Sequence, residues 1–164
     1  MKTPLFALLG VLALAAPASA QETLISLTRA VAIAERTLAA NAFEAELETD
    51  GGRLVYEIDL VRGKTFQKVL VDARSGKVVS VEKPRVEGMY RRWFDGKRLD
   101  RVARPLAPLL AGLETQSNGR VHEVGFELER GRAFYEVDIE TPNGVAEIAV
   151  DAATGQRLAL ALDD

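Results

Sequence analysis

The chain has no cysteine and a single histidine, His122, among its 164 residues. Without cysteine it cannot form a disulfide, a thiol nucleophile or a cysteine-ligated metal site. One histidine cannot supply a histidine metal cluster within the chain, and a Ser–His–Asp triad would have to use His122. The sequence also lacks a glycine-rich phosphate loop, a nucleophile elbow and a zinc-binding helix motif. We therefore predict a chain without catalytic residues, cofactor or metal.

Long apolar runs are scarce, and the prominent one spans Leu5–Ala16 near the N-terminus. It follows Lys2 and is too short for a membrane span, which needs about 20 residues. Ala18-Ser19-Ala20, just after it, has the small-x-small form of a signal-peptidase site. We predict that residues 1–20 are a cleaved signal peptide rather than a retained anchor helix, and that the mature chain starts at Gln21 in the periplasm or outside the cell.

The remaining composition is that of an ordinary globular protein, with 48% hydrophobic and 27% charged residues and a net charge of −3. The negative charge and the predicted export both disfavour nucleic-acid binding.

The mature chain contains an internal repeat with an offset of 79 residues. Residues 43–81 align without gaps on residues 122–160, with eleven identities over 39 positions. Arg53-Leu-Val-Tyr-Glu-Ile-Asp-Leu60 lies over Arg132-Ala-Phe-Tyr-Glu-Val-Asp-Ile139. Such self-similarity indicates a duplicated supersecondary unit.

Hydrophobic periodicity predicts the same elements in each copy. The first helix is predicted to start after Ser26, a plausible N-cap, and to end at Asn41. The second helix is interrupted by Pro108, so it is either kinked or begins only there. The fold class is α+β, a tandem repeat of a helix followed by a three- to four-stranded antiparallel β-meander. The predicted strands are 43–49, 54–61, 65–71 and 77–81, then 121–128, 132–140, 145–150 and 156–162. The predicted units are 21–83 and 105–164, joined by a basic aromatic connector, 84–104.

The two copies share a turn made by an aspartate and a glycine four residues later. An aspartate side chain can accept hydrogen bonds from the amides two and three residues on, and glycine can take the positive φ that closes the turn. We interpret Asp72, Gly76, Asp151 and Gly155 as structural turn residues.

The connector is basic, whereas the second copy is acidic. Residues 82–104 hold eight basic and four acidic residues, and residues 122–164 hold three basic and ten acidic ones. The connector could lie against the acidic sheet face of its own protein. It could instead be a partner-binding arm, because aromatic residues beside arginine are enriched at binding hot spots. The candidate partner-binding residues are Tyr90, Arg91, Arg92, Trp93 and Phe94.

Paired carboxylates alternate along the predicted strands. They could form a cation site or a general acid–base pair, but apolar residues on the opposite side favour the solvated face of an antiparallel sheet. His122 is interpreted as a surface residue, and Tyr56 and Tyr135 as core residues. The carboxylates are Glu44, Glu46, Glu48, Glu57, Asp59, Glu136 and Asp138.

Three segments carry a resemblance to a known family: E-x-E-L-E at Glu44–Glu48, G-R-L-V-Y-E-I-D-L at Gly52–Leu60, and V-D-A-R-S-G-K-V-V-S-V at Val71–Val81. They resemble the PepSY domain over about residues 26–81. Through F-Y-E-V-D-I and V-D-A-A-T-G, residues 105–162 resemble a diverged second copy. The plan is also similar to that of the beta-lactamase inhibitor protein, in architecture only.

The resemblance implies a small α+β module of secreted and cell-envelope proteins, found in propeptides of thermolysin-type metallopeptidases and associated with peptidase inhibition. We predict a non-enzymatic exported binding module, a peptidase inhibitor or an envelope regulatory protein, with another envelope or secreted protein as its partner. The alternative is an accessory protein without a peptidase target, which contacts an anionic membrane surface or an acidic partner through the connector. A hydrolase is the least favoured interpretation.

Overall fold

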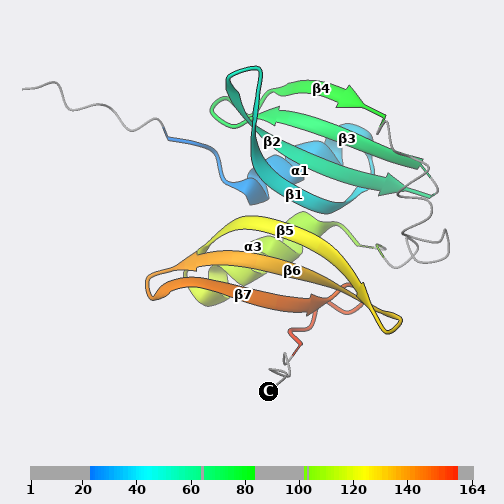
Figure 1. Ribbon diagram of the computed structural model, residues 1–164, viewed down its shortest axis with the longest axis vertical. Coiled ribbons are helices and arrows are strands. Elements are labelled where there is room, and N and C mark those ends of the chain that lie inside the picture. The colour runs from blue at the N-terminus through cyan, green and yellow to red at the C-terminus, as the bar shows by residue number, and fades with distance from the viewer. Residues whose placement is uncertain (1–22, 64, 84–101, 103, 159–164) are drawn as a thin grey trace, which may run out of the picture.

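The two predicted meanders are halves of one antiparallel sheet. The computed structural model describes residues 23–63, 65–83, 102 and 104–158. Seven strands follow the order β4-β3-β2-β1-β5-β6-β7, and Figure 1 shows the two halves one above the other. The elements are α1 (Leu27–Leu38), β1 (Asn41–Asp50), β2 (Arg53–Arg62), β3 (Thr65–Asp72), β4 (Val78–Glu82), α3 (Leu106–Ser117), β5 (Arg120–Glu129), β6 (Arg132–Thr141) and β7 (Gly144–Asp151).

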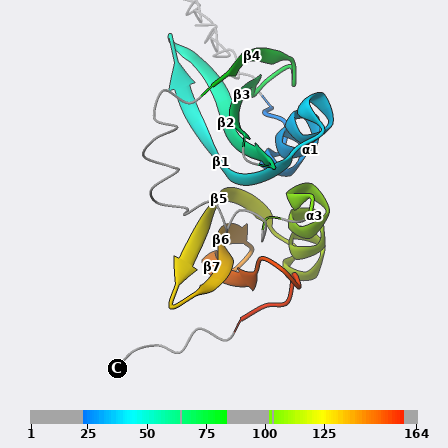
Figure 2. The same cartoon turned by 90° about the vertical axis from the view of Figure 1, so that its right-hand side faces the viewer.

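The halves meet where β1 pairs with β5 in antiparallel register, with Ala45 opposite Val124. Both helices cover the same face of the sheet, and α1 contacts α3 (Figure 2). The predicted α+β class, with a helix and an antiparallel meander in each copy, is confirmed. We call the α1–β4 half the first unit and the α3–β7 half the second unit.

The offset of 79 residues holds for both helices and for the first three strands of each unit. Even the irregularities repeat: β1 is bulged between Ala42 and Glu44, and β5 between Val121 and Glu123. Helix α1 begins at its predicted cap, because the Ser26 hydroxyl accepts a hydrogen bond from the Arg29 amide at 3.1 Å.

Each helix ends in a left-handed residue, at Ala39 with φ 49° and at Asn118 with φ 50°. The prediction that Asn41 ends the first helix is wrong, because Asn41 already begins β1. The chain reverses two residues earlier, where the N–H of Ala40 donates to the carbonyl of Glu35.

Helix α3 begins at Leu106, so the alternative in which it starts only at Pro108 is wrong. Pro108 is the third residue of the helix, where a backbone N–H would have no intrahelical partner in any case. The N-cap, Pro105, makes no side-chain hydrogen bond. The Glu35 carboxylate of α1 takes that role: it accepts hydrogen bonds from the amides of Leu106 at 2.7 Å and Ala107 at 3.3 Å.

One apolar core lies between the sheet and the two helices and runs through both units. The helices contribute the fully buried side chains of Val31 and Leu110, and the sheet contributes those of Ile58 and Val137. The predicted core position of Tyr56 and Tyr135 is confirmed, because these side chains are 5% and 2% exposed. The core is shared, and the two units are therefore parts of a single packed layer.

Some predictions fall outside the described residues. The signal peptide, residues 1–20, and the connector residues Tyr90, Arg91, Arg92, Trp93 and Phe94 are among them. Of the predicted last strand, only the start is described, as a bridge between Val150 and Arg157. None of the helices in the described ranges has the length and apolarity needed to cross a membrane.

Candidate functional site

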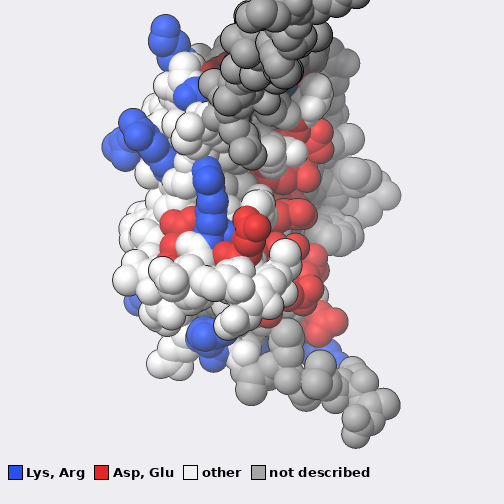
Figure 3. All heavy atoms as spheres, turned by 90° about the vertical axis from the view of Figure 1, so that its left-hand side faces the viewer, with Lys and Arg blue, Asp and Glu red and all other residues white. Residues whose placement is uncertain are grey.

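Acidic side chains gather on the sheet face that the helices leave uncovered. Strand register places them side by side, with Glu44 opposite Asp59 and Glu46 opposite Glu57 in the first unit. Figure 3 shows them along one side of the molecule. We call this surface the acidic face; it comprises Glu44, Glu46, Glu57, Asp59, Glu123, Glu127, Glu136, Asp138 and Glu147.

Burial and the charges of neighbouring carboxylates raise the pKa of three of these groups, Glu44, Glu46 and Glu136. Burial, and then the charges of Asp59, Glu46 and Glu127, raise the pKa of Glu44 to about 7. Burial also raises the pKa of Glu46, followed by the charges of Glu48 and Glu123. Since Glu123 and Glu127 belong to β5, the two units share one electrostatic field across the β1–β5 seam.

The two halves of the acidic face differ at one repeat position. In the first unit, Lys68 on β3 lies opposite Asp59 and is hydrogen-bonded to the Glu57 carboxylate. In the second unit, the position 79 residues later is Glu147, which lies opposite Asp138. A cation is thus replaced by a further carboxylate, and the second half of the face is the more negative one.

This difference is visible in the titration of Glu136, the counterpart of Glu57. Burial raises the pKa of Glu136, and the next largest cause is the charge of Glu147, followed by Glu127 and Glu129. In the first unit, by contrast, the charge of Lys68 partly offsets the rise in the pKa of Glu44 and Glu46. The second half therefore attracts cationic groups more strongly.

Of the carboxylates interpreted as a solvated face, Glu48 is exposed and most others are half-buried, but the interpretation is wrong for Asp59. Asp59 is only 6% exposed. It lies on a central strand between Glu44 of β1 and Lys68 of β3.

No group of three or more histidine or acidic side chains among the described residues could hold a metal ion. His122 is exposed, as predicted, and its Nε2 lies 2.9 Å from Oε2 of Glu140 on the adjacent strand. The predicted carboxylates thus form a charged surface and not a convergent site.

The predicted turn residues begin at the end of β3 in the first unit and at the end of β7 in the second. Oδ1 of Asp72 accepts hydrogen bonds from the amides of Ser75 at 2.7 Å and Arg74 at 3.2 Å, and these bonds lower the pKa of Asp72. Gly76 closes the turn with φ 70°. Asp151 and Gly155 repeat the arrangement, with Oδ1 of Asp151 accepting from the Thr154 and Ala153 amides at 2.8 and 3.1 Å.

Two features of the site were not predicted from the sequence. The exchange of Lys68 for Glu147 is visible in the repeat alignment, because the two residues occupy the same aligned position. The burial of Glu35 is indicated less clearly by the sequence. Its position four residues after Val31 places it on the apolar side of α1.

Comparison with known proteins matches the chain to a family model described as PepSY, peptidase propeptide and YPEB domain, over residues 24–82 and 113–159. No curated protein matches the sequence. Among solved structures, the chain is similar to a protein from Clostridium difficile 630 described provisionally as a lipoprotein. The two are 22% identical with a TM-score of 0.42, and the match covers 85% of this chain and 94% of that one.

Proposed function

The chain belongs to the PepSY family, and on that premise we propose that it is a non-enzymatic, exported binding module whose acidic face contacts a basic surface of a protein partner. The description of the family names peptidase propeptides. Membership in it supports an extracellular or cell-envelope location and a role in binding. Peptidase inhibition is the role we place first, and regulation of an envelope protein the second.

The observation that carries the proposal is the two-sidedness of the sheet. One side is buried under α1 and α3, and the other carries carboxylates from both units. In the second unit Glu123 and Glu147 are exposed, and Glu147 replaces the cation of the first unit. A surface of one sign speeds the encounter with a partner of opposite sign and repels others.

The same observation argues against an anionic membrane as the partner of this face, because like charges repel. Contact with such a surface, or with an acidic protein, would need the connector residues, which lie outside the described part of the chain. That alternative stays a prediction.

The test measures inhibition of secreted thermolysin-type metallopeptidases by the mature chain, with a fluorogenic peptide as substrate. The triple variant Glu123→Gln, Asp138→Asn, Glu147→Gln should weaken inhibition by at least about tenfold, and salt should weaken the wild-type inhibition. The control Arg29→Gln, Arg36→Gln changes exposed charges on α1 and should leave inhibition unchanged.

The two parts of the proposal fail separately. If the wild-type chain inhibits none of the peptidases, the inhibitor role is wrong. If it inhibits and the triple variant does so equally well, the acidic face is not the contact surface.

A further inference from the structure

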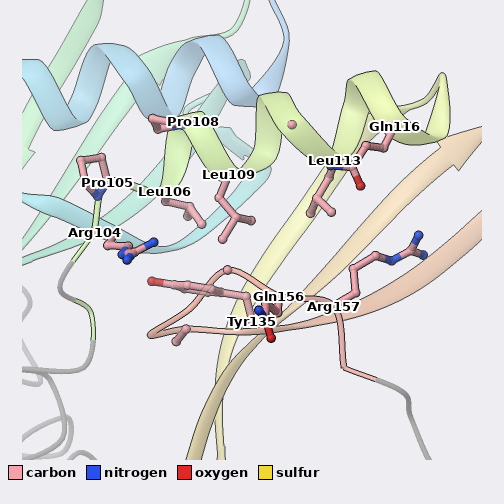
Figure 4. Close-up of a pocket in the computed structure, with 13 residues that line it drawn as sticks. Arg104, Pro105, Leu106, Pro108, Leu109, Leu113, Gln116, Tyr135, Gln156 and Arg157 are labelled. Atoms are coloured by element: carbon pink, nitrogen blue, oxygen red, sulfur yellow. The ribbon is translucent and has the colours of Figure 1, made fainter.

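A cavity of about 610 Å³ lies in the second unit, between α3 and the turn that follows β7. We call it the α3 groove. Its walls are apolar where α3 contributes Leu109 and Leu113, and Arg104 and Arg157 lie at its ends (Figure 4). It lies on the helix side of the sheet, away from the acidic face, so it is a separate candidate site.

The first unit fills the same place with its own side chains. A Cβ atom added at Gly76, in the first unit's turn, would lie 3.3 Å from Cδ1 of Ile33 and 3.5 Å from Cδ1 of Ile25. The counterparts of these isoleucines, 79 residues later, are Gly112 and Arg104. Gly112 has no side chain where the first unit has Ile33, and this leaves part of the groove open.

The first unit also shows how a peptide backbone is bound there. Ile25 precedes α1, and its N–H donates to the carbonyl of Ala73 at 2.9 Å. The hydroxyl of Tyr56 donates to the Ile25 carbonyl at 2.7 Å. Both backbone groups of one residue are therefore held, one by the turn and one by a tyrosine on β2.

The second unit keeps both of these partners, and the residue at the position of Ile25 is Arg104. Ala152 is the counterpart of Ala73, and Tyr135 of Tyr56. Tyr135 is 2% exposed as a residue, and its hydroxyl is directed along the groove toward Arg104 (Figure 4). From that position the hydroxyl can donate a hydrogen bond to a group bound in the groove. Burial and then the charge of Glu35 raise the pKa of Tyr135, so its hydroxyl keeps its proton and remains a donor.

We propose that the α3 groove binds an extended segment of a partner protein, in which a branched aliphatic residue takes the place that Ile25 has in the first unit. The carbonyl of that residue accepts from the Tyr135 hydroxyl, and its N–H donates to the Ala152 carbonyl. Its side chain fills the space beside Gly112. The two arginines at the ends of the groove favour an acidic residue next to the aliphatic one.

We take the occupant to be a second protein. At Leu158, the last described residue, the N–H donates to the carbonyl of Ala149 on β7 at 2.8 Å. The chain is thus bonded to the sheet edge at that point, outside the groove.

The first unit supplies the probe. A fluorescein-labelled peptide with the sequence of residues 22–27, Glu-Thr-Leu-Ile-Ser-Leu, presents an aliphatic pair and an acidic residue. Fluorescence anisotropy measures its binding to the mature chain, with the protein titrated to about 1 mM because short peptides bind weakly. We expect saturable binding that is lost when the peptide carries Ile25→Asp.

Matched variants at one position separate the groove from any other surface. Gly112→Ile restores the side chain of the first unit and should weaken binding at least about tenfold, since it fills the cavity. Gly112→Ala leaves most of the space and should change the affinity less than about threefold. A Cβ atom at Gly112 meets nothing within 4 Å, so both variants should fold, which a thermal melt verifies. Tyr135→Phe should weaken binding about fivefold, the effect of one net hydrogen bond.

Three results would overturn the proposal. The first is a wild-type chain that does not bind the peptide. The second is binding that Gly112→Ile retains. The third is a chain shortened to end at Leu158 that binds the peptide much more tightly than the mature chain, because its own C-terminal segment would then be the occupant. None of the residues involved belongs to the acidic face. These results therefore do not affect the proposed function, which the inhibition assay tests separately.

Discussion

The two units share the arrangement of a helix and three strands but differ in the side chains that occupy the space between the helix and the turn. In the first unit, Ile25 and Ile33 reach the turn at Gly76. In the second unit, a Cβ atom added at Gly155 would meet only Leu109, at 3.7 Å. The helices, the paired strands and the bulges keep the same offset throughout. In these elements the side chains have diverged more than the backbone.

The same contrast appears on the opposite side of the sheet, where Lys68 of the first unit becomes Glu147 in the second. It appears again between the helices, where Glu35 and its counterpart Glu114 both accept a hydrogen bond from the next strand, at 3.1 Å from Ala42 and Val121. Only Glu35 also caps α3. The first unit therefore supplies internal contacts at the places where the second unit presents open or charged surface.

The largest expected effect comes from Glu35→Ala compared with Glu114→Ala. The first change removes a carboxylate that is 9% exposed and leaves the amides of Ala42, Leu106 and Ala107 without their acceptor. We expect it to lower the free energy of unfolding by about 3 kcal/mol, and Glu114→Ala by about 1 kcal/mol. Urea unfolding of the full mature chain measures both. Equal losses would mean that the contact between α1 and α3 contributes little.

The next comparison concerns Ile33 of the first unit and its counterpart in the second unit, Gly112. Ile33→Ala should lower the free energy of unfolding by about 2 kcal/mol, because it opens a cavity where the first unit is filled. Gly112→Ala should raise it by about 1 kcal/mol, because alanine favours a helix interior and has space here. Thermal melts of the two variants should shift in opposite directions. A loss of stability in Gly112→Ala would show that the groove tolerates no added atom.

The acidic face predicts a particular pH dependence. The pKa of Glu44 is about 7 in the folded protein and near 4.5 when unfolded, so between these values the folded state binds the extra proton. Stability should therefore fall as pH rises from about 5 to 7.5. Glu44→Gln should remove part of this slope and raise the free energy of unfolding at pH 7.5 by about 1 kcal/mol. Chemical unfolding at several pH values measures the slope, and an unchanged slope would contradict the assignment to Glu44.

The smallest effect concerns the exchanged charge. Glu147→Lys gives the second unit the cation of the first, and should stabilise the protein by about 0.5 kcal/mol at low salt. Lys68→Glu should have the opposite sign and a larger size, because Lys68 is partly buried beside Glu57. Both effects should shrink in 0.5 M salt, which screens exposed charges. A salt-independent result would point to packing as the cause.

The features that could be read from the sequence are local ones. Alternating apolar residues place β2 and β6, and an aspartate with a glycine four residues later places both turns, because each pattern acts within a few residues. The start of α3 could not be read in this way. Pro108 suggests an interruption, and the residue that caps the helix instead, Glu35, lies 71 residues before Leu106.

The sequence by itself determined the repeat, the order of helix and strands, the turns and the family, since short-range hydrophobic periodicity and backbone preferences decide them. The tertiary structure alone decided that β1 pairs with β5, that Asp59 is buried, and that an α3 groove stands open in front of Tyr135. Each of these depends on contacts between residues far apart in the chain. The exposed edge of a strand can pair with many other strands, so local sequence does not select β5 as the partner of β1. A cavity forms where side chains from distant parts of the chain do not fill the space between them.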